Sequence, residues 1–270
     1  MRNIAKKSNT IEILNTYHLN ASKKYGQNFL VDPNVIIKIV ECAYIDEETV
    51  VIEIGPGIGA LTEVLAHYAK HVYAFEIDER LKDVLDDTLK ECTNVDVIFQ
   101  DFLKVDLDDF VSKIDSEKVT VVTNTPYYIT TDIITRILKS QSKISSLTAM
   151  VQKEVAQKLV NGEKSPVTMM IDYVGSISYE MTVSKNVFIP SPHVDSAVFH
   201  IEKERTIPNH LVEIIYGAFK QKRKTILNNM KAFFNEPRKA LENCGIDPTL
   251  RAQQLTIDDL VKLDQERKNL

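Results

Sequence analysis

The stretch Val50-Val51-Ile52-Glu53-Ile54-Gly55-Pro56-Gly57-Ile58-Gly59 decides the fold of this 270-residue chain. It begins as an apolar, β-branched run of the kind found in buried strands and continues directly into a turn with three glycines. Apolar residues then recur at the spacing of one helix face, at Leu61, Val64, Leu65 and Tyr68. A strand that passes through a glycine turn into a helix is the first half of a βαβ unit, whose backbone can approach a ligand closely.

Short β-rich runs alternate with segments of helical period from Thr49 to Ile201, which is typical of a parallel sheet joined by crossover helices. The stretches Ile177–Val183 and Ser196–Ile201 alternate like antiparallel strands and are expected to close one sheet edge. The predicted parallel strands are Val50–Glu53, Val72–Ile77, Val95–Gln100, Thr120–Thr123 and Leu147–Val151.

The pattern changes after Lys203. Residues 209–264 contain no strand-like run and several amphipathic helical ones, with Asn243-Cys244-Gly245 marking a helix end. We therefore place a domain boundary near 204–208. Residues 1–204 are predicted to form an α/β, Rossmann-like domain with a helical N-terminal extension, and residues 205–270 a small all-helical domain.

Composition indicates an ordered globular protein, because 44% of the residues are hydrophobic and 26% are charged. No apolar run approaches the roughly 20 residues that cross a bilayer, so we expect a cytoplasmic protein without membrane contact. Cys42, Cys92 and Cys244 are widely separated and the six histidines are scattered. This spacing predicts neither a disulfide framework nor a metal site.

The net charge of −5 is unevenly distributed. Residues 41–120 carry 20 acidic and 7 basic side chains, whereas residues 203–270 carry 13 basic and 9 acidic ones. Because attraction to phosphate is screened beyond about 8–10 Å at cellular salt, a basic end can bind RNA while an acidic middle faces away. Chance segregation of charge on solvated helices is an equally good interpretation of this signal alone.

The glycine turn and two following acids predict a nucleoside cofactor. The spacing G-x-G-x-G, with Pro56 removing one N–H donor, fits poorly to the G-x-G-x-x-G of dinucleotide sites. Glu76 ends the second strand, where a carboxylate can accept ribose hydroxyls, and Asp101 ends the third, where it can accept an adenine amino group. Each feature alone could be a tight turn or a helix cap, but the ordered set favours an adenosyl group without phosphates.

The tetrapeptide Asn124-Thr125-Pro126-Tyr127 follows the fourth predicted strand. An exocyclic adenine amine is a poor nucleophile, because its lone pair is delocalised into the ring. If the Asn124 amide oxygen and the Pro126 carbonyl each accept one N–H, the lone pair is directed towards a methyl donor, and Tyr127 can stack on the extruded base. Standing alone, a simple Asn-Pro loop is the favoured interpretation.

With these residues in place, the chain resembles the ribosomal RNA adenine dimethyltransferase family, and most closely its bacterial small-subunit (KsgA-type) branch. The likeness runs from about Ser22 to Leu263. Further blocks that carry it are Gly26-Gln27-Asn28-Phe29-Leu30, E-I-G-P-G-I-G-A-L-T-E at 53–63, Gln152-Lys153-Glu154-Val155-Ala156, Pro190-Ser191-Pro192-His193-Val194-Asp195-Ser196-Ala197-Val198, Gln221-Lys222-Arg223-Lys224-Thr225 and Gly245-Ile246-Asp247-Pro248.

The resemblance implies an S-adenosylmethionine-dependent methyltransferase sheet. We also expect a monomeric enzyme that contains no metal ion. It implies dimethylation of the N6 amines of two adjacent adenosines in a 3′-terminal hairpin of 16S rRNA, within the immature small ribosomal subunit. Asn124, Pro126 and Tyr127 would hold the target base. The implied contacts with S-adenosyl-L-methionine are Asn28, Leu30, Gly55, Glu76, Asp101 and Asn124.

A basic cluster of Lys220, Lys222, Arg223 and Lys224 lies on a predicted helix, and we interpret it as a contact with rRNA phosphates rather than a solvated helix face. Two other functions remain open. One is methylation of 23S rRNA adenine, as in the macrolide-resistance branch. The other is a ribosome-assembly factor that keeps the fold without catalysis.

Overall fold

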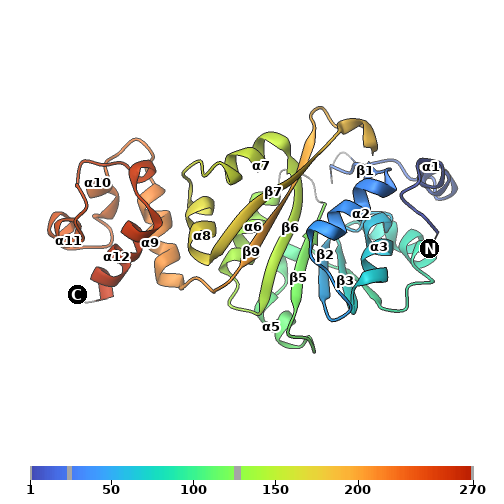
Figure 1. Ribbon diagram of the computed structural model, residues 1–270, viewed down its shortest axis with the longest axis horizontal. Helices are drawn as coiled ribbons and strands as arrows, with labels where there is room; N and C mark the ends of the chain where they lie inside the picture. The colour runs from blue at the N-terminus through green and yellow to red at the C-terminus, as the bar shows by residue number, and fades with distance from the viewer. Residues whose placement is uncertain (1, 23–25, 125–128, 269–270) are drawn as a thin grey trace.

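A seven-stranded mixed sheet forms the centre of the computed structural model, which describes residues 2–22, 26–124 and 129–268 (Figure 1). The strand order is β4-β3-β2-β5-β6-β9-β7. Strands β4 to β6 in this order run parallel, whereas β9 is antiparallel to both β6 and β7. The strands are β2 (Val50–Ile54), β3 (His71–Glu76), β4 (Val95–Phe99), β5 (Val119–Thr123), β6 (Ile144–Gln152), β7 (Gly175–Val183) and β9 (Ser196–Lys203).

The predicted α/β class and each predicted strand are confirmed, including the two antiparallel strands at one edge. Most strand ends differ from the prediction by one or two residues. The largest difference is at β6, which begins at Ile144 rather than Leu147. Ile144 pairs with Val119 across an irregularity in the ladder, so the neighbouring strand extends the pairing beyond the apolar run.

Successive residues of β2 enter two separate cores on the two faces of the sheet. Val51 packs into a core with helices α1 (Lys7–Thr16), α2 (Pro33–Cys42), α3 (Ala60–Tyr68) and α4 (Lys82–Thr88). Ile52 packs into the other core with α5 (Leu107–Ser112), α6 (Thr130–Lys139), α7 (Lys153–Val160) and α8 (Pro166–Val174). Burial on both faces explains why the parallel strands are continuously apolar instead of alternating.

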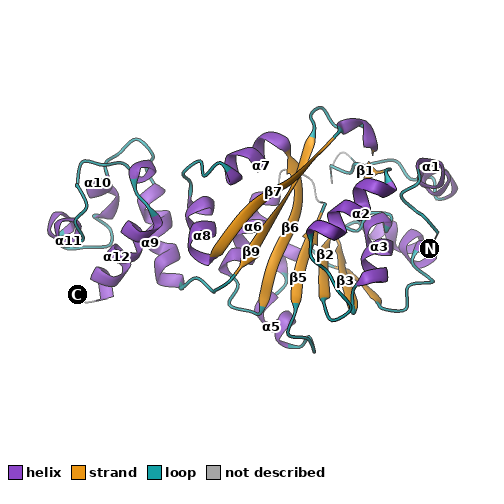
Figure 2. Cartoon of the chain, viewed as in Figure 1, coloured by secondary structure: helices purple, strands orange, loops and turns teal. Residues whose placement is uncertain are grey.

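Four helices follow β9 at the end of the molecule opposite the N-terminus (Figures 1 and 2). The segment 204–208 joins β9 to the first of them. A single buried cluster nevertheless includes Val174 of α8, Ile207 and Leu211, so the helices pack directly on the sheet domain. The helices are α9 (Asn209–Phe219), α10 (Ile226–Met230), α11 (Pro237–Asn243) and α12 (Ile257–Lys268).

Three sequence expectations concern membrane spans, metal sites and the cysteines. Among the described residues, no helix is long and apolar enough to cross a membrane. Within the same ranges, no three His, Cys, Asp or Glu side chains are grouped so that they could hold a metal ion. Cys42, Cys92 and Cys244 are free thiols.

A testable consequence of the fold concerns Gly175, the first residue of β7. A Cβ atom built on it would lie 2.0 Å from the backbone carbonyl oxygen of Glu202 on β9. Because backbone atoms of a paired strand cannot move aside, we expect Gly175→Ala to destabilise the protein by about 1–3 kcal/mol in chemical denaturation. Ser176→Ala, at the exposed next position, should change stability by less than about 0.5 kcal/mol. Equal stability of the two variants would contradict this packing.

Candidate cofactor pocket and functional site

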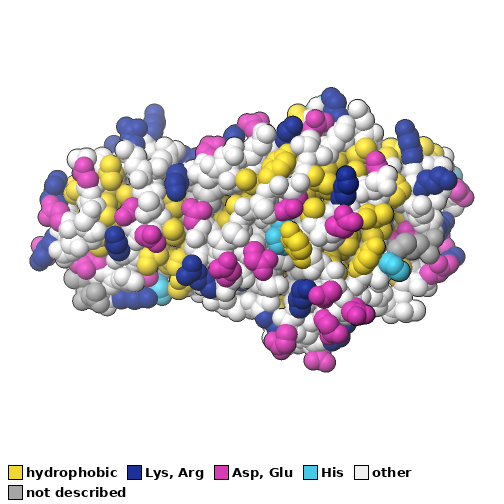
Figure 3. Space-filling view, in the orientation of Figure 1, with side chains coloured by type: hydrophobic (Ala, Val, Ile, Leu, Met, Phe, Trp, Pro, Cys, Tyr) yellow, Lys and Arg dark blue, Asp and Glu magenta, His cyan; other side chains and the backbone are white. Residues whose placement is uncertain are grey.

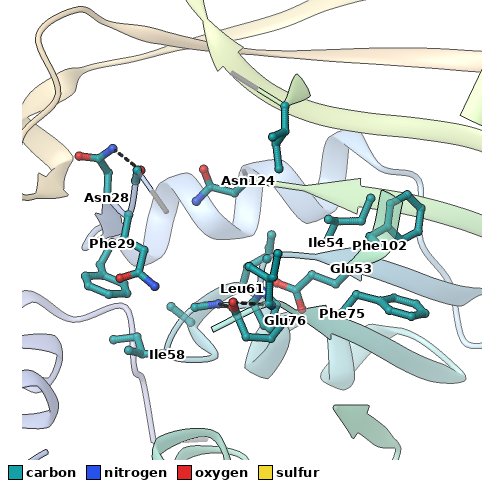
Figure 4. Close-up of a pocket in the computed structure, with 18 of the residues that line it drawn as sticks. Asn28, Phe29, Glu53, Ile54, Ile58, Leu61, Phe75, Glu76, Phe102 and Asn124 are labelled. Atoms are coloured by element: carbon teal, nitrogen blue, oxygen red, sulfur yellow. Dashed lines mark hydrogen bonds between the residues drawn. The ribbon is translucent and has the colours of Figure 1, made fainter. Parts of the chain in front are cut away.

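A pocket lies at the carboxyl ends of the parallel strands, where the strand order reverses around β2. Open α/β sheets bind ligands at this position, because loops diverge there and leave a crevice. The pocket contains all six residues expected to contact a cofactor: Asn28, Leu30, Gly55, Glu76, Asp101 and Asn124. Residues brought together from five separate segments of the chain therefore surround one cavity (Figure 4).

The glycine turn between β2 and α3 lines the pocket. Gly55, Gly57 and Gly59 have φ angles of 77°, 60° and 89°, a backbone region that side chains rarely adopt. Gly59 also stands at the start of α3, where an added Cβ would lie 2.9 Å from Leu89 Cδ2. The turn thus needs glycine for its backbone conformation and, at Gly59, for packing against the next helix.

Glu76 ends β3 and holds this turn in place. Its side chain is 4% exposed. Oε1 accepts the backbone N–H groups of Ile77 and Asp78, both at 2.8 Å, and Oε2 accepts that of Gly57 at 3.2 Å. Burial raises the pKa of Glu76, and these three N–H groups oppose the rise. Since a carboxylate offers about four acceptor positions, about one remains for a ligand hydroxyl.

The pocket wall beyond Glu76 is apolar. Phe75 of β3 and Phe102 pack edge to face with ring centroids 5.5 Å apart, and Ile54 lies beside them. Asp101 caps the short helix that begins at Phe102, and its Oδ1 accepts the Leu103 N–H at 3.0 Å. An apolar wall with a carboxylate at its edge suits a planar base with an exocyclic amine.

The opposite wall comes from the N-terminal extension. Phe29 and Leu30 form β1, a short strand paired antiparallel with β8 (Phe188–Ile189). The Asn28 amide donates to the Gly26 carbonyl at 3.0 Å, which fixes its side chain at the pocket. Gln27 Nε2 donates to Asp78 Oδ2 at 2.9 Å, so this segment is tied to the loop that follows β3.

Asn124 follows β5 and reaches the same pocket. The last residue of β5, Thr123, donates its hydroxyl to the Ile54 carbonyl at 3.2 Å and so joins the ends of β5 and β2. In Figure 4 the amides of Asn28 and Asn124 lie above the carboxyl of Glu76. Pro126 and Tyr127, the other two expected catalytic residues, and Thr125 lie outside the described residues.

The sequence interpretation missed Glu53, which also lines the pocket. This side chain is 1% exposed, and its Oε2 has no hydrogen-bond partner among the described residues. Burial raises the pKa of Glu53 to about 8, and the nearby Glu76 carboxylate contributes to the rise. A charged residue inside the otherwise apolar run V-V-I-E-I was the signal available in the sequence.

Residues 18–268 match the family model described as ribosomal RNA adenine dimethylase. The chain belongs to this family. It is 42% identical to the ribosomal RNA small subunit methyltransferase A of Staphylococcus aureus strain Newman, over 99% of this chain and 96% of that relative. The protein of strain JH9 is 41% identical over the same shares of both chains. As a member of the adenine dimethylase family, this chain is an S-adenosylmethionine-dependent methyltransferase.

Two solved structures are similar to the fold of this adenine dimethylase family member. The 23S rRNA methyltransferase ErmE has a TM-score of 0.66 and 26% identity, covering 88% of this chain and 99% of that one. A dimethyladenosine transferase from Plasmodium falciparum has a TM-score of 0.72 and 22% identity, covering 87% of this chain and 95% of that one. The second likeness concerns the fold alone.

The basic cluster Lys220, Lys222, Arg223 and Lys224 requires a correction. It does not lie on a helix, because α9 ends at Phe219 and residues 221–224 form a turn before α10. Asn229 Nδ2 donates to the Ala218 carbonyl at 2.6 Å and thereby caps the end of α9. All four side chains are exposed, and none forms an ion pair with a described residue. Lys and Arg side chains gather above the connection between α9 and α10 (Figure 3).

A first test of the pocket uses Glu76→Ala. Loss of this carboxylate removes a ligand acceptor and releases Gly57, so we expect S-adenosylmethionine binding to weaken by about 1–3 kcal/mol in calorimetry. Glu63→Ala is the matched control, because Glu63 is also buried and accepts the backbone N–H groups of Asn3 and Ile4, but lies outside the pocket. Unchanged affinity in a folded Glu76→Ala protein would remove Glu76 from the site.

Proposed function

We propose that this chain dimethylates the N6 amines of two adjacent adenosines in a hairpin near the 3′ end of 16S rRNA, with S-adenosylmethionine as methyl donor. The observation that carries the proposal is the position of Asn124, which follows β5 and shares one pocket with Glu76 and Asp101. A base held at Asn124 would meet a methyl donor held by the two carboxylates. The name of the 42% identical relatives supports the small subunit as the target.

The proposed role of Asn124 follows from the electronic structure of the target. Because the N6 lone pair is delocalised into the adenine ring, the amine must change geometry before it can attack. The Asn124 amide oxygen would accept one N–H and the Pro126 carbonyl the other, which localises the lone pair, while Tyr127 would stack on the base. S-adenosylmethionine supplies an electrophilic methyl group. The proton of the methylated nitrogen then leaves to water, so no charged general base is required.

The pocket residues fit the proposed cofactor. The remaining acceptor position on Glu76 suits a ribose hydroxyl, and the apolar wall of Ile54, Phe75 and Phe102 suits an adenine ring. Asn28, Leu30 and Gly55 would complete the contacts from the N-terminal segment and the glycine turn. Methyl transfer from a sulfonium needs no metal ion, and we propose that the protein acts without one, as a monomer on the immature small subunit in the cytoplasm.

Two alternatives are less well supported. Methylation of 23S rRNA would agree with the likeness to ErmE, but identity to that protein is 26% against 42% for the small-subunit relative. A non-catalytic assembly factor would have no need of acidic and amide side chains around a single pocket at the switch point of the sheet.

A methyl-transfer assay separates the three functions. The protein is incubated with S-adenosylmethionine carrying a labelled methyl group and with immature small subunits or large subunits, and the labelled nucleotides are mapped. We expect label only in small subunits, as N6,N6-dimethyladenosine at two adjacent positions near the 3′ end. Label in large-subunit rRNA would favour the 23S alternative, and absence of label would favour the assembly factor.

Asn124→Ala tests the amine-activation role. Removing one preorganised polar partner is expected to lower kcat on the order of 10²–10³-fold. Affinity for rRNA should change little, since phosphate contacts supply most of it. Single-turnover methylation at saturating S-adenosylmethionine measures the chemical step, and filter binding measures RNA affinity. A near wild-type rate would mean that the Asn-Pro turn is structural.

The triple variant Lys222→Ala, Arg223→Ala and Lys224→Ala tests the proposed contact with rRNA phosphates. Each lost contact should reduce the slope of log affinity against log salt by up to about 0.9. Lys231→Ala combined with Lys239→Ala provides a control on other exposed lysines of the same helical region. An unaltered slope in the triple variant would assign the cluster to a solvated surface.

A further inference from the structure

The pocket has an unbalanced charge. Three carboxyl groups line it, those of Glu53, Glu76 and Asp101, whereas none of its described lining residues is Lys, Arg or His. Asp101 has an exposed cation nearby, with its Oδ2 3.6 Å from Lys104 Nζ. The other two acids have no ion-pair partner among the described residues, and both are more than nine-tenths buried.

Glu53 and Glu76 share one face of the sheet. In the parallel pairing of β2 and β3, Glu53 lies opposite Ala74, so Glu76 is the next residue of β3 on the same side. Figure 4 shows both carboxyl groups in the pocket next to Leu61. Two buried carboxylates on the same face of neighbouring strands repel each other. In a low-dielectric site, one of them is expected to keep its proton.

The hydrogen bonds identify which group keeps the proton. Three backbone N–H groups donate to Glu76, and such donors stabilise the charged form. Glu53 Oε2, by contrast, has no hydrogen-bond partner in the part of the chain that the structure describes. Consistently, burial raises the pKa of Glu53; the Thr62 hydroxyl opposes this rise, the Glu76 carboxylate adds to it, and the result is a pKa of about 8.

We propose that Glu53 selects for the positive charge of the methyl donor: its carboxyl holds a proton in the empty pocket and loses that proton to solvent when a cationic ligand binds. The O–H bond of Glu53 breaks, the proton passes to the buffer, and the resulting carboxylate balances the ligand charge. The proposal rests on S-adenosylmethionine as cofactor and is independent of the RNA that is methylated.

The other acidic groups near the pocket have partners of their own. Asp78, which follows β3, is paired with Arg80 at 2.6 Å and accepts from Gln27, and these contacts lower its pKa. Asp101 is partly exposed and lies beside Lys104. On the α3 side, Thr62 faces Glu53 and Glu63 is engaged by the N-terminal segment.

The proposal predicts a defined pH dependence of cofactor affinity. Below about pH 8 the empty protein carries the Glu53 proton, so binding must release it, and Kd should rise by up to about tenfold for each unit of falling pH. Above about pH 8 the proton is already lost and this contribution disappears.

The direct test is calorimetric titration of the full-length protein with S-adenosylmethionine at about pH 7, in buffers with different ionisation enthalpies. The slope of the observed enthalpy against buffer ionisation enthalpy gives the protons exchanged. We expect release of most of one proton from the wild type and less at about pH 9. Glu53→Gln should abolish this release and weaken binding, by about tenfold or more at high pH and by less at low pH.

Further titrations show which positive charge of the ligand causes the proton release, and they exclude other sources of protons. Adenosine, which lacks both cationic groups of the cofactor, should bind without proton release. S-adenosylhomocysteine keeps the ammonium but not the sulfonium, so release with it assigns the effect to the ammonium, and no release assigns it to the sulfonium. The ligand is the same in both titrations, so the titration of Glu53→Gln measures any protons that the ligand itself exchanges, and these can be subtracted. The matched control Glu63→Gln should release protons as the wild type does.

Two results would overturn the proposal: no proton release by the wild type, or equal release by Glu53→Gln. If that variant does not fold, difference infrared spectroscopy of the wild type gives an independent answer. The carbonyl band of a protonated carboxylic acid should be present in the empty protein and disappear on binding S-adenosylmethionine, and a band unchanged by the ligand would contradict the account. Loss of rRNA methylation alone would bear on the proposed substrate and not on Glu53.

Discussion

The hydrogen bond from Gly57 to the buried Glu76 carboxylate joins the turn after β2 to the end of β3, and the rest of the pocket depends on it. The three positive-φ glycines of the turn have no side chains, so besides the buried Ile58 the turn needs support from its neighbours. Glu76 supplies this support, and the N–H groups of Ile77 and Asp78 supply its charge compensation. Asp78 in turn contacts Gln27, so the N-terminal segment is positioned by the same loop.

Charge is divided between the pocket and the surface in a way that suits a cationic cofactor and a polyanionic substrate. The pocket is acidic, and Asp and Glu side chains also gather around α5 (Figure 3). Acidic groups repel RNA phosphates, so RNA affinity must come from basic residues elsewhere. The exposed basic turn at 220–224 is the surface proposed for this contact, and screening over about 8–10 Å allows both signs of charge to act within one molecule.

The sequence predicted those features that follow from local pattern. Apolar runs fixed the parallel strands, and the carboxyl ends of neighbouring parallel strands necessarily placed Glu76 and Asp101 at one edge. Features set by tertiary contacts were missed. Asn229, ten residues beyond the last residue of α9, caps the end of that helix, so the basic cluster lies on a turn. The protonation of Glu53 depends on its distance from water and from Glu76. The capping contact has no local signature, and the charged residue in the apolar run V-V-I-E-I marks Glu53 as unusual without identifying its neighbours.

The central claim is that a single pocket at the carboxyl edge of β2, β3, β4 and β5 holds the methyl donor. Hydrogen–deuterium exchange with and without S-adenosylmethionine tests it most directly, because it reports every backbone amide without any substitution. The account predicts slower exchange in peptides that contain 26–30, 55–59, 76–78 and 101–103, and unchanged exchange at 220–224. Protection confined to other segments, or absent from the glycine turn, would contradict it.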